Sequence, residues 1–265
     1  MERIVCSWCQ AQNDADRTTC ASCGAPLDAH NVVMDSGWRE APRLRDMTQI
    51  GFGNSTCQVE GEIVPVAEMT LAQGDGVFFE HHAMLWKDPT VPIAAISSGG
   101  GMSRMLGGMP YLVTTATGPG RVAFSRDAAG EVVVLPLQPS EELDVREHAF
   151  LVASHTIQYS FERIKGFKNV MHGGEGMYLD RFVTAGDPGI LLLHGYGNVF
   201  ERRLQAGEKI LLEPGGFLYK DSSVTMDIQQ QDVKTGIGHK GLYLAEMTGP
   251  GRVGMQSMYV HHESE

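Results

Sequence analysis

Apolar residues in this chain recur in short runs that are separated by glycine, proline, asparagine and aspartate. Runs of this length, rich in β-branched and aromatic residues, predict strands. The clearest are Cys57–Ile63, Gly76–Phe79, Arg121–Phe124, Glu131–Pro136, Ile190–Leu193, Lys209–Leu212 and Val253–Val260. Helical periodicity is scarce, with short candidate pieces near Met102–Leu106 and Ile164–Val170. The pattern predicts an all-β sandwich or barrel over residues 49–260.

One stretch of the chain recurs. GDGVFFEHHAMLWKD at 74–88 matches GEKILLEPGGFLYKD at 207–221, and half of the offset leads to SEELDVREHAFLVAS at 140–154. A Tyr-Leu pair followed by a Pro-Gly turn also occurs three times, and the outer two turns read TGPGRV. A fixed period marks a unit that buries its apolar face against its neighbours. We therefore expect three β-sandwich units in a pseudo-threefold arrangement, at about 49–124, 125–192 and 193–260.

The N-terminal region carries two Cys-x2-Cys pairs separated by ten residues. The four cysteines are Cys6, Cys9, Cys20 and Cys23. Two such pairs close a tetrahedral four-thiolate site, which is the usual structural zinc arrangement, with iron as the main rival. We expect residues 1–27 to form a zinc ribbon that folds on binding the ion, followed by a polar linker over 28–48. Cys57, within a strand-like run, is interpreted as a buried small side chain.

The charge balance is acidic, with a formal net charge of −11. This opposes non-specific binding to a nucleic acid backbone, which needs clustered Lys and Arg, and residues 1–27 contain Arg3 and Arg17 alone. No apolar run approaches the roughly 18 residues of a membrane helix. The N-terminus resembles neither a signal peptide nor a transit peptide, so we expect a cytoplasmic protein.

Other residue groups suggest chemistry less strongly. His81 and His82 follow Glu80, and His148 lies at the matching repeat position, which raises the alternative of a cupin-like metal site. Adjacent residues on a strand point to opposite faces, however, and metal ligands on a strand should share one face. The run around Ser97 mimics a nucleophile elbow, but that motif requires an α/β sheet. We therefore expect no enzymatic activity.

From about residue 50 to 260 the chain resembles the altered-inheritance-of-mitochondria family of TRAP-like β-proteins. The resemblance is carried by GDGVFFEHHAMLWKD, GGGMSRMLGGMPYLVTT, GGEGMYLDRF, HGYGNVFERRLQAGEKILLEPGGFLYKD and TGPGRVGMQS. It implies three double-layered β units around a pseudo-threefold axis, copies that often assemble further, and no established activity. Fungal relatives are mitochondrial and linked to inner-membrane organisation. The tryptophan-binding and RNA-binding residues of the attenuation protein that gives TRAP its name have no counterparts that can be placed here.

Two functions fit these observations. The first is a non-enzymatic scaffold or assembly protein that can form a homo-oligomer and whose zinc ribbon docks a protein partner. The alternative is a small-ligand sensor that binds between neighbouring β units, a reading that rests on fold analogy. A third reading, nucleic acid binding through the ribbon, is opposed by the charge.

Overall fold

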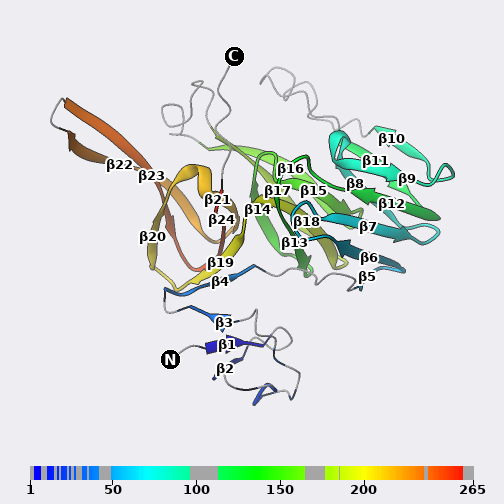
Figure 1. Ribbon diagram of the computed structural model, residues 1–265, viewed down its shortest axis with the longest axis horizontal. Helices are drawn as coiled ribbons and strands as arrows, with labels where there is room; N and C mark the ends of the chain where they lie inside the picture. The colour runs from blue at the N-terminus through cyan, green and yellow to red at the C-terminus, as the bar shows by residue number, and fades with distance from the viewer. Residues whose placement is uncertain are drawn as a thin grey trace. The chain divides into compact units, whose positions relative to one another are not determined.

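The computed structural model describes residues 3–6, 11–14, 17, 19–22, 24, 27, 32–34, 36–41, 49–95, 113–164, 177–184, 186–235 and 238–258. The chain divides into two compact units. One is Pro42–Gly197, and the other combines Met1–Ala41 with Asn198–Glu265. The described residues form strands and two short 3-10 turns, so the expected all-β class is confirmed (Figure 1).

The unit Pro42–Gly197 contains a five-stranded antiparallel sheet in the order β5-β6-β7-β12-β9. Its strands are β5 (Gln49–Phe52), β6 (Ser55–Glu60), β7 (Val66–Leu71), β12 (Gly120–Phe124) and β9 (Met84–Lys87). β6 alternates buried and partly exposed residues, as expected for a strand with one face on a core. The run expected as a strand up to Ile63 ends at Glu60, because the chain bends there and leaves Ile63 exposed.

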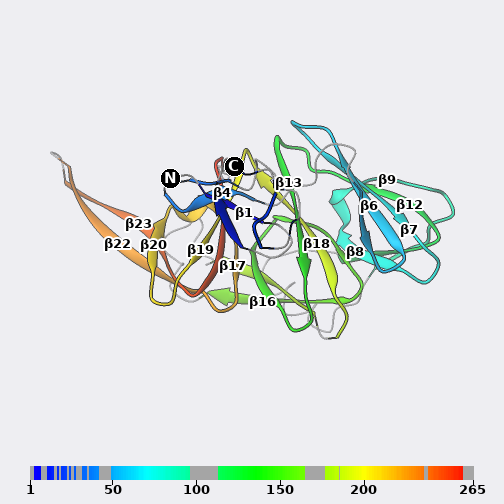
Figure 2. The ribbon, with the colours of Figure 1, turned by 90° about the horizontal axis from the view of Figure 1, so that it is seen from below.

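A six-stranded sheet in the order β10-β11-β8-β15-β18-β13 packs against the five-stranded one, and Figure 2 shows β8 beside the layer of β6, β7, β9 and β12. Its strands are β10 (Ile93–Ala95), β11 (Val113–Thr117), β8 (Gly76–Glu80), β15 (Phe150–Ser154), β18 (Gly189–Tyr196) and β13 (Gly130–Leu137). Residues such as Met69, Phe79, Phe124 and Leu192 form the core between the two sheets.

A third layer in this unit covers the opposite face of the six-stranded sheet. Its strands are β16 (Ile157–Ile164), β17 (Met177–Thr184) and β14 (Glu142–Arg146), paired in that order. Rings from the two layers meet in an aromatic cluster, with Phe150 and Phe182 centroids 4.8 Å apart and Tyr159 and Phe182 centroids 5.3 Å apart. The central strands β8 and β15 are therefore buried on both faces. This explains why their sequences are continuous apolar runs without alternation.

The unit formed by Met1–Ala41 and Asn198–Glu265 has three sheet portions. A small N-terminal sheet pairs β2 (Gln12–Asp14), β1 (Arg3–Val5) and β3 (Val32–Val33). A second portion pairs β21 (Phe217–Asp221), β24 (Gly251–Gln256), β19 (Val199–Leu204) and β4 (Trp38–Glu40). The third pairs β20 (Lys209–Leu212), β23 (Gly238–Thr248) and β22 (Thr225–Thr235), and Figure 1 shows the β22–β23 hairpin extending beyond β20.

The order of pairing is the same in three successive sets of six strands. We call β7–β12 the first group, β13–β18 the second group and β19–β24 the third group. In each group the first strand pairs with the sixth and the sixth with the third, while the second pairs with the fifth and the fifth with the fourth. The placement of three units around one axis stays a prediction.

The segment expected as a linker contributes strands to the structure. Within residues 28–48, β3 pairs with β1, and β4 pairs with β19. At the other end, β24 stops at Gln256, short of the strand expected up to Val260. The expected helical pieces, Met102–Leu106 and Ile164–Val170, fall outside the described residues apart from Ile164, which ends β16.

Candidate functional site

The N-terminal module brings two of the predicted metal ligands into buried positions. Cys6 follows β1 and is fully buried, and Cys20 is 3% exposed. Cys9 and Cys23 lie outside the described residues. The described residues contain no cluster of three metal-ligating side chains, so the four-cysteine zinc site stays a prediction.

The Cys20 sulfur accepts two N–H donors. The Ser22 backbone N–H lies 3.4 Å from it, and the Asn13 side-chain amide lies 3.5 Å away. Asn13 also accepts the Ala21 N–H at 2.7 Å, and Gly24, at φ +73°, closes the turn by donating to the Cys20 carbonyl at 2.9 Å. N–H groups that point at a sulfur stabilise a thiolate, which is the form that binds metal. The spacing of cysteines gave no sign of Asn13.

Strand β4 ties the module to the third group through a buried charge. The Arg39 guanidinium lies beside the Glu201 carboxylate, with Nε at 3.2 Å from Oε1. The other carboxylate oxygen accepts the Tyr219 hydroxyl at 2.9 Å. The Glu201 side chain is 2% exposed, and Tyr219 is fully buried. Burial and the neighbouring Glu201 raise the pKa of Tyr219 well above its usual value, so the hydroxyl stays a donor.

The two sequence motifs that recur most closely, Lys-Asp and TGPGRV, are joined by a hydrogen bond at one turn. In the first group Asp88 accepts the Arg121 backbone N–H at 2.9 Å, and in the third group Asp221 accepts the Arg252 backbone N–H at 2.7 Å. Both arginine side chains also lie beside these carboxylates. The recurrence of the aspartate and of the arginine in TGPGRV therefore has a structural cause.

In the second group Ser154 takes the place of the aspartate. Its hydroxyl accepts the Ile190 N–H at 3.0 Å. Ser154 Oγ lies 2.9 Å from Thr156 Oγ1, which donates to the Pro188 carbonyl at 3.1 Å. Because the Thr156 hydrogen goes to Pro188, Ser154 donates its own hydrogen to Thr156. The hydroxyl thus holds the turn and does not form a nucleophile–base pair with the adjacent His155.

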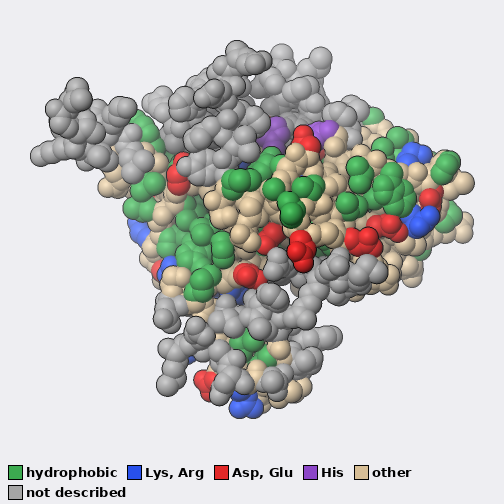
Figure 3. Space-filling model, in the orientation of Figure 1, with side chains coloured by type: hydrophobic (Ala, Val, Ile, Leu, Met, Phe, Trp, Pro, Cys, Tyr) green, Lys and Arg blue, Asp and Glu red, His purple; other side chains and the backbone are tan. Residues whose placement is uncertain are grey.

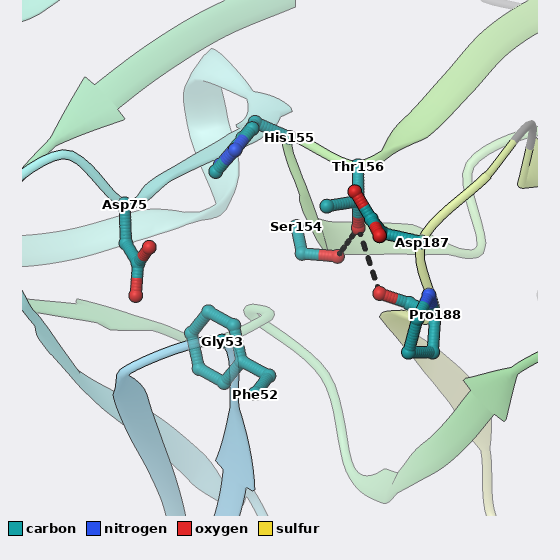
Figure 4. A pocket seen from close by; sticks show the side chains of 8 residues that line it. All are labelled: Phe52, Gly53, Asp75, Ser154, His155, Thr156, Asp187 and Pro188. Carbon is teal, nitrogen blue, oxygen red and sulfur yellow. Dashed lines mark hydrogen bonds between the residues drawn. The ribbon is translucent and has the colours of Figure 1, made fainter.

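A cavity of about 350 Å³ opens beside this turn, within the unit Pro42–Gly197. It is lined by Phe52, Gly53, Asp75, Ser154, His155, Thr156, Asp187 and Pro188 (Figure 4). The Gly76 N–H donates to Nδ1 of His155 at 3.0 Å. Asp75 accepts the Ser55 hydroxyl at 2.7 Å and the Asn54 N–H at 2.8 Å, and these bonds lower the pKa of its carboxyl group. The Asp75 carboxylate is therefore charged at neutral pH.

Two of the cavity residues depart from the pattern shared by the groups. His155 corresponds to Pro89 in the first group and Ser222 in the third. Asp187 precedes the proline of the turn, where the other two groups have glycine. The turn itself is formed without these side chains in the other groups. His155 and Asp187 therefore make the turn of the second group chemically different from the corresponding turns of the other two groups.

Of the histidines considered as a metal site, the His82 ring and the backbone carbonyl of His148 contact a buried arginine. Arg126 Nη1 lies 3.2 Å from the buried Glu80 carboxylate, and the same guanidinium contacts His82 Nε2 and the His148 carbonyl. His82 belongs to a 3-10 turn, so the strand geometry assumed for it was wrong. His82 Nε2 thus contacts the Arg126 guanidinium and also lies 3.1 Å from the Glu80 carboxylate.

Two further buried side chains have altered acidity. Burial lowers the pKa of His194 to about 4, assisted by the charge of Arg126, and its Nε2 lies 3.1 Å from the Ala128 carbonyl. Burial raises the pKa of the Cys57 thiol to about 12. Cys57 is fully buried in the core, which confirms its interpretation as a small apolar side chain.

Comparison with known proteins identifies the family. The model of the family described as Mitochondrial biogenesis AIM24 matches residues 57–258. The chain belongs to this family. The family match begins after the cysteine module and β4, so both lie outside it. A search of curated proteins finds no match.

A solved structure shows the same fold. Protein SPYM3_0169 from Streptococcus pyogenes is similar to this chain with a TM-score of 0.60 and 19% sequence identity. The similarity covers 77% of this chain and 94% of that one. At this identity the likeness concerns the fold alone. Within the described residues no helix is long and apolar enough to cross a membrane.

Proposed function

We propose that this AIM24-family chain is a non-enzymatic scaffold whose zinc-bound N-terminal module docks a protein partner. The observation that carries the proposal is the Cys20 sulfur, which accepts the Ser22 and Asn13 N–H groups in the manner of a metal-bound thiolate. The module is joined to the third group by β4 and its buried Arg39–Glu201 pair. It is thus anchored to the third group, as a docking element would need to be.

Charge favours a protein partner over nucleic acid. The cations of the module are already engaged, since Arg3 donates to the Gln12 side chain at 2.7 Å and Arg17 donates to the Thr19 carbonyl at 3.3 Å. The chain as a whole carries a net charge of −11. Nucleic acid binding depends on clustered cations that can replace the counterions of phosphates. The cytoplasmic location expected from the sequence stays a prediction.

Metal analysis and partner capture test the proposal together. We expect one zinc ion per full-length chain and its loss in the double variant Cys20→Ser/Cys23→Ser. Cys57→Ala, which removes a cysteine outside the module, should keep the ion. A pull-down with the same three proteins should capture a partner through the wild type and Cys57→Ala, and lose it with the double variant. A wild-type chain free of zinc, or equal capture by all three, would refute the proposal.

The cavity beside His155 supports a second candidate function, the binding of a small ligand. The supporting observation is that His155 and Asp187, which differ from the residues of the other two groups, both line it. A thermal-shift screen against amino acids and nucleotides tests this, because a ligand that binds the folded form raises Tm. The control is His155→Ser/Asp187→Gly, which installs the residues of the third group. A shift present in both proteins, or in neither, would set this candidate aside.

A further inference from the structure

Among the edge strands of the described sheets, β9 and β20 belong to corresponding places in the pairing pattern of the groups. β9 pairs with β12, and β20 pairs with β23. Among the described residues, no strand lies along the other side of either. Such an edge presents a row of free N–H and C=O groups that can pair with another chain.

Both edge strands expose a leucine. Leu85 in β9 is 58% exposed, and Leu211 in β20 is 46% exposed. Figure 3 shows hydrophobic side chains at the surface over each of these strands. An exposed apolar residue on a free edge is a feature that proteins usually avoid, unless the edge has a partner.

The chain itself contains two paired strands that occupy the same places in their groups as β20 and β9. β20 is the second strand of its group, as β8 is in the first group, and β9 is the third strand of its group, as β15 is in the second. β8 and β15 pair antiparallel, with Phe79 opposite Val152 and Phe78 opposite Ala153. Every residue of both strands is buried. A second strand from one group thus accepts the third strand of another.

The exposed leucines occupy positions that this pairing buries. Leu85 corresponds to Leu151, which is fully buried, and Leu211 corresponds to Phe78, which is 5% exposed. Phe78 is covered both by Phe150 of the paired strand β15 and by Phe182 of the facing layer, so the paired strand and the covering layer together account for its burial.

We propose that copies of this chain associate head to tail, with β20 of one copy pairing antiparallel with β9 of the next. The β8–β15 register, carried over, places Leu212 opposite Trp86 and Leu211 opposite Lys87. This inference extends the proposed scaffold function by naming a second copy as a partner, and it uses a surface separate from the cysteine module.

The proposed β20–β9 pair between copies differs from the internal β8–β15 pair in one hydrogen bond. At the end of β15, the His155 N–H donates to the Gly76 carbonyl at 3.0 Å. Pro89 follows β9 at the corresponding place and has no N–H, so this bond is absent between copies. The association is therefore weaker than the internal pairing and reversible with dilution. Because the two edges differ, each copy keeps one free edge after pairing, and the assembly closes as a ring or grows as a filament.

Light scattering on the full-length chain tests the inference. The molar mass should rise with concentration above 28.9 kDa. Leu85→Asp and Leu211→Asp each block one edge, and they should fold normally because both side chains are exposed. Each variant alone should be monomeric, with self-association weakened at least about tenfold. An equimolar mixture should form a dimer of about 58 kDa, twice the monomer mass, since each variant retains the edge that the other lacks.

Disulfide trapping tests the register. Opposed residues of an antiparallel pair lie within disulfide reach, so Lys87→Cys and Leu211→Cys should cross-link between chains on oxidation. Leu85→Cys with Leu211→Cys, two residues out of register, is the control and should cross-link far less. A monomer at all concentrations, a mixture that stays monomeric, or equal cross-linking by both pairs would overturn the inference. Partner capture through the cysteine module would survive that result, so the two proposals fail separately.

Discussion

Replacing Arg39 by methionine measures how far β4 stabilises the unit formed by Met1–Ala41 and Asn198–Glu265. Methionine keeps the aliphatic stem and removes the charge. Among the described residues, Glu201 then retains the Tyr219 hydroxyl at 2.9 Å as its hydrogen-bond donor. A carboxylate that is 2% exposed loses the guanidinium in contact with it, while the charge of Arg252 remains and offsets part of the cost of burial.

The expected loss follows from the burial of the pair. Removing one partner from a buried ion pair costs about 3–5 kcal/mol. The Arg39 side chain is 16% exposed, which favours the lower end, about 3 kcal/mol. For a unit of this size each kcal/mol lowers Tm by about 4 °C, so a fall of roughly 12 °C is expected.

Urea unfolding followed by circular dichroism, with calorimetry for Tm, is the assay. Arg39→Lys keeps the charge but not the planar fork and should lose less than half as much. The double variant Arg39→Met/Glu201→Gln removes both charges and leaves an amide oxygen for Tyr219, so it should recover most of the loss. A single variant within about 0.5 kcal/mol of wild type, or a double variant no more stable than the single one, would refute the reasoning.

Three further predictions concern the second and third groups. Ser140 has φ +67°, and the first group has Gly74 at the corresponding position. Ser140→Gly should therefore raise the free energy of unfolding by roughly 0.5–1 kcal/mol. A lower urea midpoint would contradict this. Gly251 has φ +139°, and an added Cβ would lie 2.7 Å from Val224 Cγ2, so Gly251→Val should cost at least about 2 kcal/mol in the same assay. The folded-state pKa of His194 is about 4, below its unfolded value, so the unfolded chain binds its proton first and stability falls as the pH drops from about 6.5 to about 4. NMR titration should find His194 neutral at pH 6. A charged His194 at that pH would show that its pKa is not lowered and does not cause the loss of stability.

The strands could be predicted because a strand that is buried on both faces appears in the sequence as a short continuous run of apolar residues. The runs at Glu131–Pro136 and Ile190–Leu193 lie within β13 and β18, which are buried on both faces except at Pro136 and Tyr196. The special backbone at Gly120 and Gly251 was also predictable, since both sit in TGPGRV, and both have φ near +140°.

Long-range pairing could not be predicted. Arg39 and Glu201 are 162 residues apart, and the strand Trp38–Glu40 has no apolar period that would separate it from a linker. Arg126 and His82 are 44 residues apart, so the sequence offered His82 as a ligand without showing the guanidinium beside it. Such contacts depend on the fold as a whole and leave no local signal.

The hydrogen-bonded turn that recurs in the three groups keeps its charges balanced in each of them. Where the residue after the Pro-Gly pair is Arg121 or Arg252, its partner is an aspartate, and where it is Ile190, the partner is the uncharged Ser154. The arginine and the aspartate thus occur together or are both replaced, so they form one unit of the turn. In the second group, where the pair is absent, other polar residues occupy the same turn, and the cavity beside His155 lies there.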